Sequence, residues 1–246
     1  MRVAAVQAPL LPAASMDAIG LICARVSQCE AEGIEVLCCP EAILGGLADY
    51  CESPTRFALS AKPGRLESVF SPFASDTLTT ILGFTELADE GRLYNSAAVF
   101  QRGTILGVYR KWHPAIRRSV YSEGSAAPVF QIGDRRCGIV ICNDSNYAEP
   151  VRQMTALSAT VLFIPTNNGL PVDRDQTRIA AQARKVDIAL AVENNLWVVR
   201  ADVAGKADGL VSYGSSAIVG PGGGVLKSGR PMAEDFIVSE IRDAPR

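Results

Sequence analysis

The sequence predicts an α/β fold in a single domain, with strands that run in both directions. Short apolar, β-branched runs alternate with stretches of helical periodicity, and several runs are apolar throughout, as in strands covered on both faces. The 246 residues fit one large domain, which we place at residues 1–246. Hydrophobic residues make up 48% of the chain and charged residues only 20%, so a sizeable core is expected and disorder is not.

Nine segments have the apolar, β-branched pattern of strands. In chain order they are Val3–Gln7, Glu35–Cys39, Leu78–Phe84, Ser96–Phe100, Thr104–Tyr109, Arg136–Cys142, Thr160–Pro165, Leu196–Ala201 and Gly214–Val219. Only Gln101-Arg102-Gly103 separates the fourth from the fifth, which predicts a hairpin. Hairpin strands are antiparallel, whereas strands joined through helices are usually parallel. The sheet is therefore predicted to be mixed.

Two segments repeat apolar residues every three or four positions, which predicts helices. The stripes are Met16, Ile19, Cys23 and Val26, and then Ile179, Ala183, Val186 and Leu190. Ser15 is the expected N-cap of the first helix, and Asp173 with Gln176 resembles a capping box for the second. The glycine-rich segment 220–224 lacks the Lys-Ser/Thr of a phosphate loop, and no helical pattern follows it. We therefore predict a hairpin turn there.

Composition excludes several classes of function. The formal net charge is −2 and no block of Lys or Arg occurs, so we expect neither a nucleic-acid nor a membrane partner. No apolar stretch reaches the roughly 18 residues that a membrane span needs. Gln7, Pro9 and Pro12 interrupt the apolar start, so no secretion signal is expected. Seven cysteines, an odd number, then indicate a reducing compartment, and we expect a cytoplasmic protein without disulfides.

Metal ligands in a usual pattern are missing from the sequence. The chain has one histidine, His113, and no C-x-x-C motif. A structural zinc site needs two ligand pairs at suitable spacing. We therefore expect neither a metal nor an organic cofactor.

Reactive side chains follow three of the predicted strands. They lie in Cys38-Cys39-Pro40-Glu41, in Tyr109-Arg110-Lys111-Trp112-His113 and in Gly138-Ile139-Val140-Ile141-Cys142-Asn143-Asp144. Strand ends in α/β folds are the places from which reactive groups reach a common crevice. A thiol, a carboxylate and an ammonium group are therefore expected to meet there.

These three segments resemble the signature blocks of the nitrilase superfamily of carbon–nitrogen hydrolases. The matching patterns are Pro40-Glu41, Tyr109-Arg110-Lys111-x-His113 and Gly138-x-x-x-Cys142-x-Asp144. Three later stretches also match: Tyr147-Ala148-Glu149, the segment from Arg184 to Asn194 and the segment from Tyr213 to Gly223. The resemblance covers most of the chain. It implies an α-β-β-α sandwich, amidase-type activity and a homodimer.

The chemistry of these residues agrees with that resemblance. A thiol has an ordinary pKa of about 8.5 and needs help to attack at neutral pH. We expect Cys142 to be the nucleophile and Glu41 to be the base that takes its proton. Lys111 and the backbone N–H of Asn143 would stabilise the negative charge that develops on oxygen. The expected substrates are small linear amides or N-carbamoyl compounds, with nitriles less favoured.

The substrate-binding candidates come from loops. They are Asn143, Tyr147, Arg117, Glu123 and Asn167. Many members of the superfamily carry a second glutamate where Arg117 stands, and Glu123 is the residue that could replace it in space. An Arg117 cation at the mouth of the pocket would favour a substrate with a carboxylate.

Other interpretations remain open from the residues alone. Taken singly, Cys142 reads as a small buried hydrophobic residue, Glu41 as a loop carboxylate and Lys111 as a surface lysine. A Cys–His dyad with His113 is a weaker possibility than a structural role for that histidine. The same thioester could pass its acyl group to an amine. The chain could also be a binding protein that kept the fold, or, with less support, a redox-active thiol protein.

Overall fold

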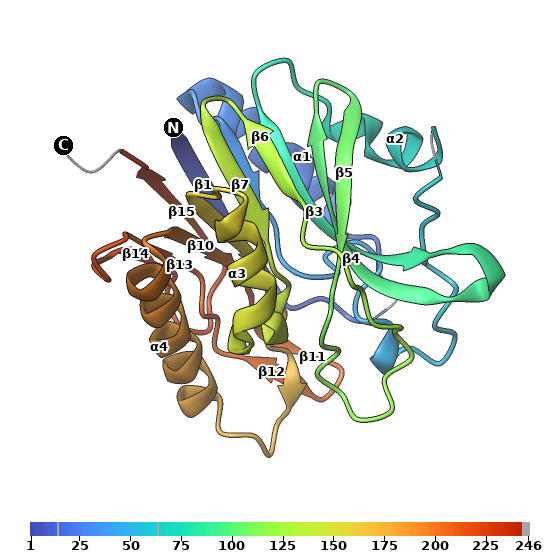
Figure 1. Cartoon of the computed structure of the whole chain (residues 1–246). Coiled ribbons are helices and arrows are strands. Elements are labelled where there is room, and N and C mark those ends of the chain that lie inside the picture. The colour runs from blue at the N-terminus through green and yellow to red at the C-terminus, as the bar shows by residue number, and fades with distance from the viewer. Residues whose placement is uncertain (14, 63, 243–246) are drawn as a thin grey trace.

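Two β-sheets packed face to face form the centre of the molecule, and helices cover their outer faces (Figure 1). The computed structural model describes residues 1–13, 15–62 and 64–242. Both sheets contain parallel and antiparallel neighbours, so the predicted mixed pairing is confirmed.

The first sheet has strand order β5-β4-β3-β2-β1-β11-β12-β9, and β15 pairs with β1. Its strands are β1 (Arg2–Pro9), β2 (Val36–Cys38), β3 (Thr79–Leu87), β4 (Leu93–Gln101), β5 (Thr104–Arg110), β9 (Leu170–Pro171), β11 (Val203–Ala207), β12 (Leu210–Ser212) and β15 (Asp235–Glu240). β1, β2 and β3 are parallel, whereas β3, β4 and β5 are antiparallel. The hairpin predicted at 101–103 therefore joins β4 to β5.

The second sheet has strand order β14-β13-β10-β8-β7-β6. Its strands are β6 (Val129–Ile132), β7 (Arg135–Ile139), β8 (Val161–Pro165), β10 (Trp197–Ala201), β13 (Ala217–Val219) and β14 (Val225–Ser228). β7, β8 and β10 are parallel, while β6, β13 and β14 are antiparallel to their neighbours. Residues 220–224 form the turn between β13 and β14, which confirms the predicted hairpin.

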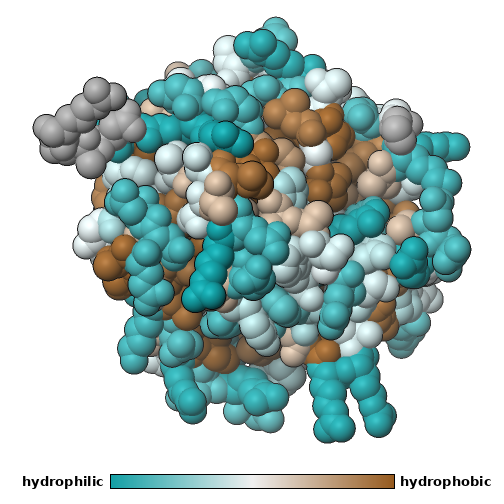
Figure 2. All heavy atoms as spheres, in the orientation of Figure 1, coloured by the Kyte–Doolittle hydropathy of each residue, from teal (hydrophilic) through white to brown (hydrophobic). Residues whose placement is uncertain are grey.

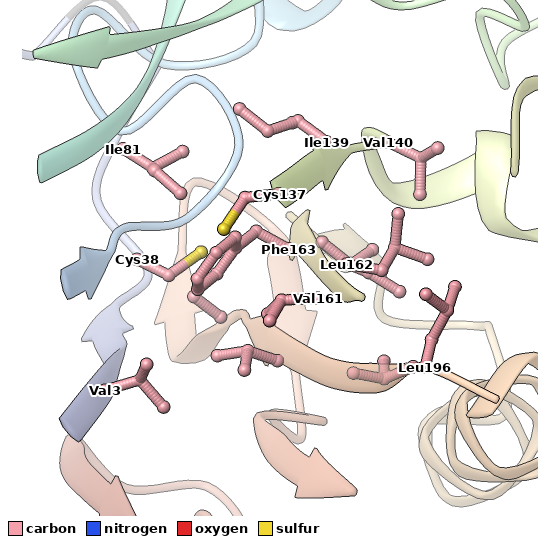
Figure 3. Packing of buried hydrophobic residues seen from close by; sticks show 14 of the residues in the cluster. Val3, Cys38, Ile81, Cys137, Ile139, Val140, Val161, Leu162, Phe163 and Leu196 are labelled. Carbon is pink, nitrogen blue, oxygen red and sulfur yellow. The ribbon is translucent and has the colours of Figure 1, made fainter. Parts of the chain in front are cut away.

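Buried side chains from both sheets fill the space between them. Val3, Cys38 and Ile81 come from the first sheet, and Cys137 and Phe163 come from the second. Figure 3 shows the sulfurs of Cys38 and Cys137 turned toward Phe163. Because each sheet is covered on both faces, its central strands are apolar on both sides, which explains the continuous apolar runs in the sequence.

In the described part of the chain, four α-helices form the outer layers: α1 (Ala18–Glu32), α2 (Arg65–Phe70), α3 (Ala148–Ala156) and α4 (Gln176–Asn194). A second cluster of buried hydrophobic residues joins α1 and α2 to the first sheet, with Ile22 and Phe70 among its members. Met154 of α3 and Leu190 of α4 belong to the core on the side of the second sheet. Figure 1 shows the two helix pairs on opposite sides of the strands. The expected α-β-β-α sandwich is therefore present.

Both predicted helix starts are wrong by two residues. The residue before α1 is Asp17, and the Ser15 hydroxyl accepts the Asp17 N–H at 3.0 Å instead of capping the helix. At α4 the cap is Asp175, whose carboxylate accepts the Arg178 N–H at 3.0 Å. A residue caps a helix only if its side chain can reach a free backbone N–H of the first turn. Asp173 and Asp175 both precede α4, and the path of the preceding loop decides which of the two reaches that N–H.

The predicted strand Arg136–Cys142 also extends too far. β7 ends at Ile139, and Cys142 begins a short 3₁₀ turn, Cys142–Asn146. Several elements were not predicted, namely β6, β9, β11, β12, β14, β15, α2 and α3. Some of these elements, such as β9 with two residues and β12 with three, are too short for a periodic pattern to stand out.

Hydrophilic side chains cover much of the face seen in Figure 2, and smaller hydrophobic patches lie between them. Within the part of the chain that the structure describes, none of the helices has the length and apolar character needed to cross a bilayer.

Candidate active site

Glu41, Lys111 and Cys142 line one cavity of about 510 Å³, although they are far apart in the chain. Glu41 comes three residues after β2, Lys111 comes directly after β5, and Cys142 comes three residues after β7. Their elements belong to both sheets, so the sandwich itself brings them together. The predicted convergence of a thiol, a carboxylate and an ammonium group is therefore present in the fold.

The Glu41 carboxylate is held by three donors. Its Oε1 accepts hydrogen bonds from Lys111 Nζ at 2.6 Å and from Asn95 Nδ2 at 2.7 Å. Its Oε2 accepts the backbone N–H of Asn167 at 2.9 Å. Glu41 is 1% exposed and Lys111 is 4% exposed. This buried, multiply bonded carboxylate has a fixed direction, which general base catalysis requires.

The Lys111 ammonium is the cationic member of this pair. Burial disfavours its charged form, but the Glu41 carboxylate, with smaller contributions from Cys142 and Asp144, outweighs burial and raises the pKa of Lys111 above its usual value. Lys111 therefore stays protonated at neutral pH. It can donate to a negative oxygen in the cavity and does not act as a base.

The thiol is presented by a strained turn. Cys142 has a φ of 46°, in the left-handed region that few residues other than glycine occupy. Its carbonyl accepts the Ser145 hydroxyl at 2.7 Å, which closes the turn. Burial, reinforced by the nearby Glu41, raises the pKa of the Cys142 thiol to about 12, although Lys111 and Arg200 act to lower it. A raised pKa favours the protonated thiol over the thiolate at neutral pH.

Asp144 connects the turn Cys142–Asn146 to the loop that begins at Lys111. Its buried carboxylate accepts the Tyr109 hydroxyl at 2.8 Å and the His113 N–H at 2.7 Å. It also accepts the Ile141 N–H at 3.2 Å, from the residue before the nucleophile. These contacts of Asp144 hold the two segments together.

A family model for carbon–nitrogen hydrolases matches residues 2–244. The chain belongs to the carbon–nitrogen hydrolase family. It is therefore an enzyme of this class, and the nitrilase-superfamily resemblance predicted from the sequence is confirmed.

Curated and solved relatives agree with this assignment. A nitrilase from Pyrococcus abyssi is 28% identical over 219 residues, which cover 88% of this chain and 80% of that protein. An (R)-stereoselective amidase from a Pseudomonas species is 31% identical over 214 residues, covering 84% of this chain and 73% of that protein. The NitN amidase structure from Nesterenkonia sp. AN1 superposes with a TM-score of 0.82 at 23% identity, covering 99% of this chain and 93% of that one. This last likeness supports the shared fold.

Two of the five predicted substrate-binding residues line the cavity of this carbon–nitrogen hydrolase. Asn143 lines it, and its side-chain amide donates to the His113 carbonyl at 3.0 Å. Asn167 also lines it, and its Oδ1 accepts the Gly169 N–H at 3.0 Å. Both side chains are therefore engaged in shaping the loops. The Asn167 N–H is already bonded to Glu41 Oε2 at 2.9 Å, whereas the Asn143 N–H stays a predicted donor to the substrate.

The structure does not bring Arg117, Glu123 or Tyr147 to the cavity wall. Arg117 and Glu123 are exposed, and the exposed Tyr147 ring stacks on His113 at 3.8 Å between centroids. Arg117 is absent from the cavity wall because of the path that its loop takes.

Asp49 pins that loop. Its carboxylate accepts the Ser119 hydroxyl at 3.0 Å and the Val120 N–H at 2.8 Å. Residues 114–116 line the cavity, while Arg117 is exposed and does not line it. The carboxylate preference expected from Arg117 therefore loses its structural basis.

Sequence reasoning did not single out several polar residues of the cavity, among them Asn95, Asn168 and Arg200. The Cys142 thiol donates to Asn168 Oδ1 at 3.9 Å. The Asn168 amide nitrogen donates to Asp202 at 2.9 Å and to Ser215 at 3.2 Å, so its oxygen must face the sulfur. The sequence offered one signal for such a residue: Arg200 is a charged residue inside the apolar strand β10.

We expect Gly83→Ala to impair both folding and activity. A Cβ at Gly83 in β3 would lie 2.6 Å from the Ala42 nitrogen and 2.9 Å from the Glu41 Cα, so it would push on the backbone that carries the base. Overpacking of this kind destabilises by roughly 1–3 kcal/mol. Thermal unfolding and turnover measure the two effects.

Gly20→Ala is the matched control. Gly20 lies in α1 with no atom within 4 Å of a Cβ, and the same substitution there should stabilise by roughly 0.5–1 kcal/mol and leave activity unchanged. Equal melting temperatures and rates for Gly83→Ala and the wild type would contradict the packing argument.

Proposed function

We propose that this protein hydrolyses a non-peptide carbon–nitrogen bond in a small linear amide or N-carbamoyl compound, through a thioester on Cys142. The single observation that carries the proposal is the shared cavity. A buried carboxylate paired with an ammonium group lines the same space as a thiol. Family membership supports the reaction class, and the residue roles and the substrate are proposed from the geometry.

In the first half-reaction the thiol is the nucleophile. Glu41 takes the proton from Cys142 as the sulfur attacks the carbonyl carbon, and the C=O electron pair moves onto oxygen. The Lys111 ammonium stabilises that oxyanion, together with a backbone N–H of the turn Cys142–Asn146, which we call the nucleophile turn. When the intermediate collapses, the C–N bond breaks and Glu41 returns its proton to nitrogen. Ammonia or an amine leaves, and the acyl group remains on sulfur.

In the second half-reaction water replaces the thiol. Glu41, again ionised, takes a proton from a water molecule that attacks the thioester carbon. The C–S bond then breaks, the acid leaves, and the sulfur recovers a proton from Glu41. One carboxylate can serve both steps because it alternates between base and acid.

The cavity and one of the relatives are consistent with a small amide as substrate. A volume of about 510 Å³ fits a small molecule, and asparagine side chains and the arginines Arg174 and Arg178 contribute to its lining. The matched Pseudomonas relative is named as an amidase. The homodimer and the cytoplasmic location stay predictions.

A substrate panel tests the proposal. Linear amides, ureido acids and nitriles are assayed for released ammonia, with Cys142→Ala as the blank. We expect turnover of at least one amide, which yields ammonia and a carboxylic acid, or of at least one ureido acid, which yields ammonia, carbon dioxide and an amine. Product that forms only when an amine acceptor is added would favour acyl transfer. No turnover, together with no acyl adduct on Cys142 by intact-mass measurement, would favour a non-catalytic protein.

The protonation state of the thiol gives a pH prediction. Because the pKa of Cys142 is raised to about 12, the thiolate fraction in the free enzyme should increase about tenfold per pH unit throughout the neutral range. Iodoacetamide labelling of Cys142, followed by peptide mass mapping, should accelerate accordingly up to at least pH 9. A rate that is already constant below pH 7 would instead indicate a preformed thiolate, and the general-base step would have to be abandoned.

A further inference from the structure

An ion pair that the mechanism above does not use lies buried behind the nucleophile turn. Arg200 of β10 is 2% exposed and Asp187 of α4 is fully buried. The arginine Nε donates to both carboxylate oxygens, at 2.9 and 3.0 Å, and Nη2 donates to Oδ1 at 2.6 Å. Burying such a pair is often no more favourable than burying apolar residues of the same size. Stability alone therefore gives little reason for its presence.

The other contacts of the guanidinium lead to the catalytic residues. Nη2 donates to the Ser145 hydroxyl oxygen at 3.2 Å, and that hydroxyl donates to the Cys142 carbonyl at 2.7 Å. Nη1 donates to the Thr166 hydroxyl oxygen at 2.7 Å. The Thr166 carbonyl accepts the Glu41 N–H at 3.3 Å. One planar group is thus a single residue away from both the nucleophile and the base.

We propose that Arg200, anchored by Asp187, is a positioning residue that fixes the Cys142 turn relative to the Glu41 loop. A guanidinium suits this task because it presents its five N–H donors in one rigid plane, so it can hold three partners at set angles. A lysine ammonium in the same place would reach fewer of them. The strained backbone at Cys142 gives the turn a reason to need an external brace.

Charge adds to this positioning. The charged groups that act on the thiol are Glu41 after β2, Lys111 after β5, and Arg200 and Asp202 at the end of β10. Arg200 favours the thiolate, whereas Glu41 and Asp202 disfavour it. Removing the arginine therefore raises the pKa of the thiol and slows its alkylation at neutral pH.

This inference rests on the proposed function, because it takes Cys142 as the nucleophile and Glu41 as the base. The experiment compares four variants. Arg200→Met combined with Asp187→Leu removes both charges and fills the space with apolar atoms, so no charge is left unpaired. Arg200→Lys keeps the positive charge and loses the planar set of N–H donors. Ser145→Ala cuts the link to Cys142 and leaves the ion pair intact. Glu86→Gln is the control, because Glu86 is also a buried carboxylate paired with an arginine, Arg110, and it does not line the cavity.

Three quantities are measured: kcat and KM on the best amide, the second-order rate of Cys142 alkylation at several pH values, and the melting temperature. We expect kcat to fall about tenfold to a hundredfold in the first three variants, with KM changed less than about twofold, because misplacement of about 1 Å acts on the reacting geometry. Alkylation at neutral pH slows in the double variant. Arg200→Lys recovers the alkylation rate and not kcat. Glu86→Gln keeps the wild-type kcat and alkylation rate.

Two results would overturn the proposal. One is a folded double variant whose kcat and alkylation profile match the wild type, and the other is the same loss of kcat in Glu86→Gln. If the double variant does not fold, the test is made with Ser145→Ala. Unchanged kcat and an unchanged alkylation rate in that variant would reject the positioning role of Arg200. If the wild type turns over no member of the substrate panel, the proposed function fails. The alkylation profile then still measures whether Arg200 controls the thiol.

Discussion

Cys142→Ala is expected to abolish ammonia release, by a factor on the order of 10⁴ or more, because no other group can form the thioester. The fold should survive. The side chain is only half-buried, and removing the sulfur deletes one long hydrogen bond, 3.9 Å to Asn168, and a partly buried contact with the core. The backbone strain at this position is the same for alanine as for cysteine. Ammonia release under saturating substrate, with the melting temperature measured in parallel, checks both parts.

Cys23→Ala is the control for this variant. Cys23 is a free thiol in α1 whose sulfur donates to the Pro72 carbonyl at 3.6 Å, outside the cavity. It should keep wild-type turnover. Near-normal turnover in Cys142→Ala would show that the nucleophile has been assigned to the wrong residue.

Glu41→Gln is expected to lower kcat by about 10²–10⁴, the usual contribution of a general base. Glutamine has almost the same shape, so the amide can still bond to Asn95 or to the Asn167 N–H. What disappears is the proton acceptor and the negative charge that pairs with Lys111 at 2.6 Å. The buried ammonium then lacks its counter-ion, and the pKa of Lys111 should fall.

An activated substrate separates the two half-reactions in this variant. A good leaving group departs without a proton, so acylation of Cys142 can proceed slowly in Glu41→Gln while hydrolysis of the thioester still lacks its base. Intact-mass measurement should therefore reveal an accumulated acyl-enzyme, which the wild type clears. Turnover within tenfold of the wild type, with no accumulated adduct, would remove Glu41 from the mechanism.

The sequence predicted the positions of the central strands and the three proposed catalytic residues. β1, β8 and β10 lie within one or two residues of their predicted bounds, because a strand covered on both faces needs an unbroken apolar run. Glu41, Lys111 and Cys142 stood out because each lies at or just after the end of a predicted strand. Elements as short as β9, which has two residues, contain too few side chains for any period to appear.

Loop paths were the part that the sequence left undecided. Arg117 was expected at the cavity, but the contacts of Asp49 with Ser119 and Val120, some 70 residues away, turn that loop so that its neighbours line the cavity instead. Arg174 and Arg178 were not considered as lining residues, although they precede and begin the helix that forms one wall.

By itself, the amino-acid sequence determined the mixed α/β architecture and the identity of the reactive groups, because hydrophobic periodicity and strand-end motifs act over a few neighbouring residues. Only the tertiary structure decided what surrounds those groups. Asn168 beside the thiol and the Arg200–Asp187 pair behind it depend on contacts between distant strands and helices. Such contacts follow from how buried polar groups find partners once the two sheets have packed, and a single sequence does not specify those partners in advance.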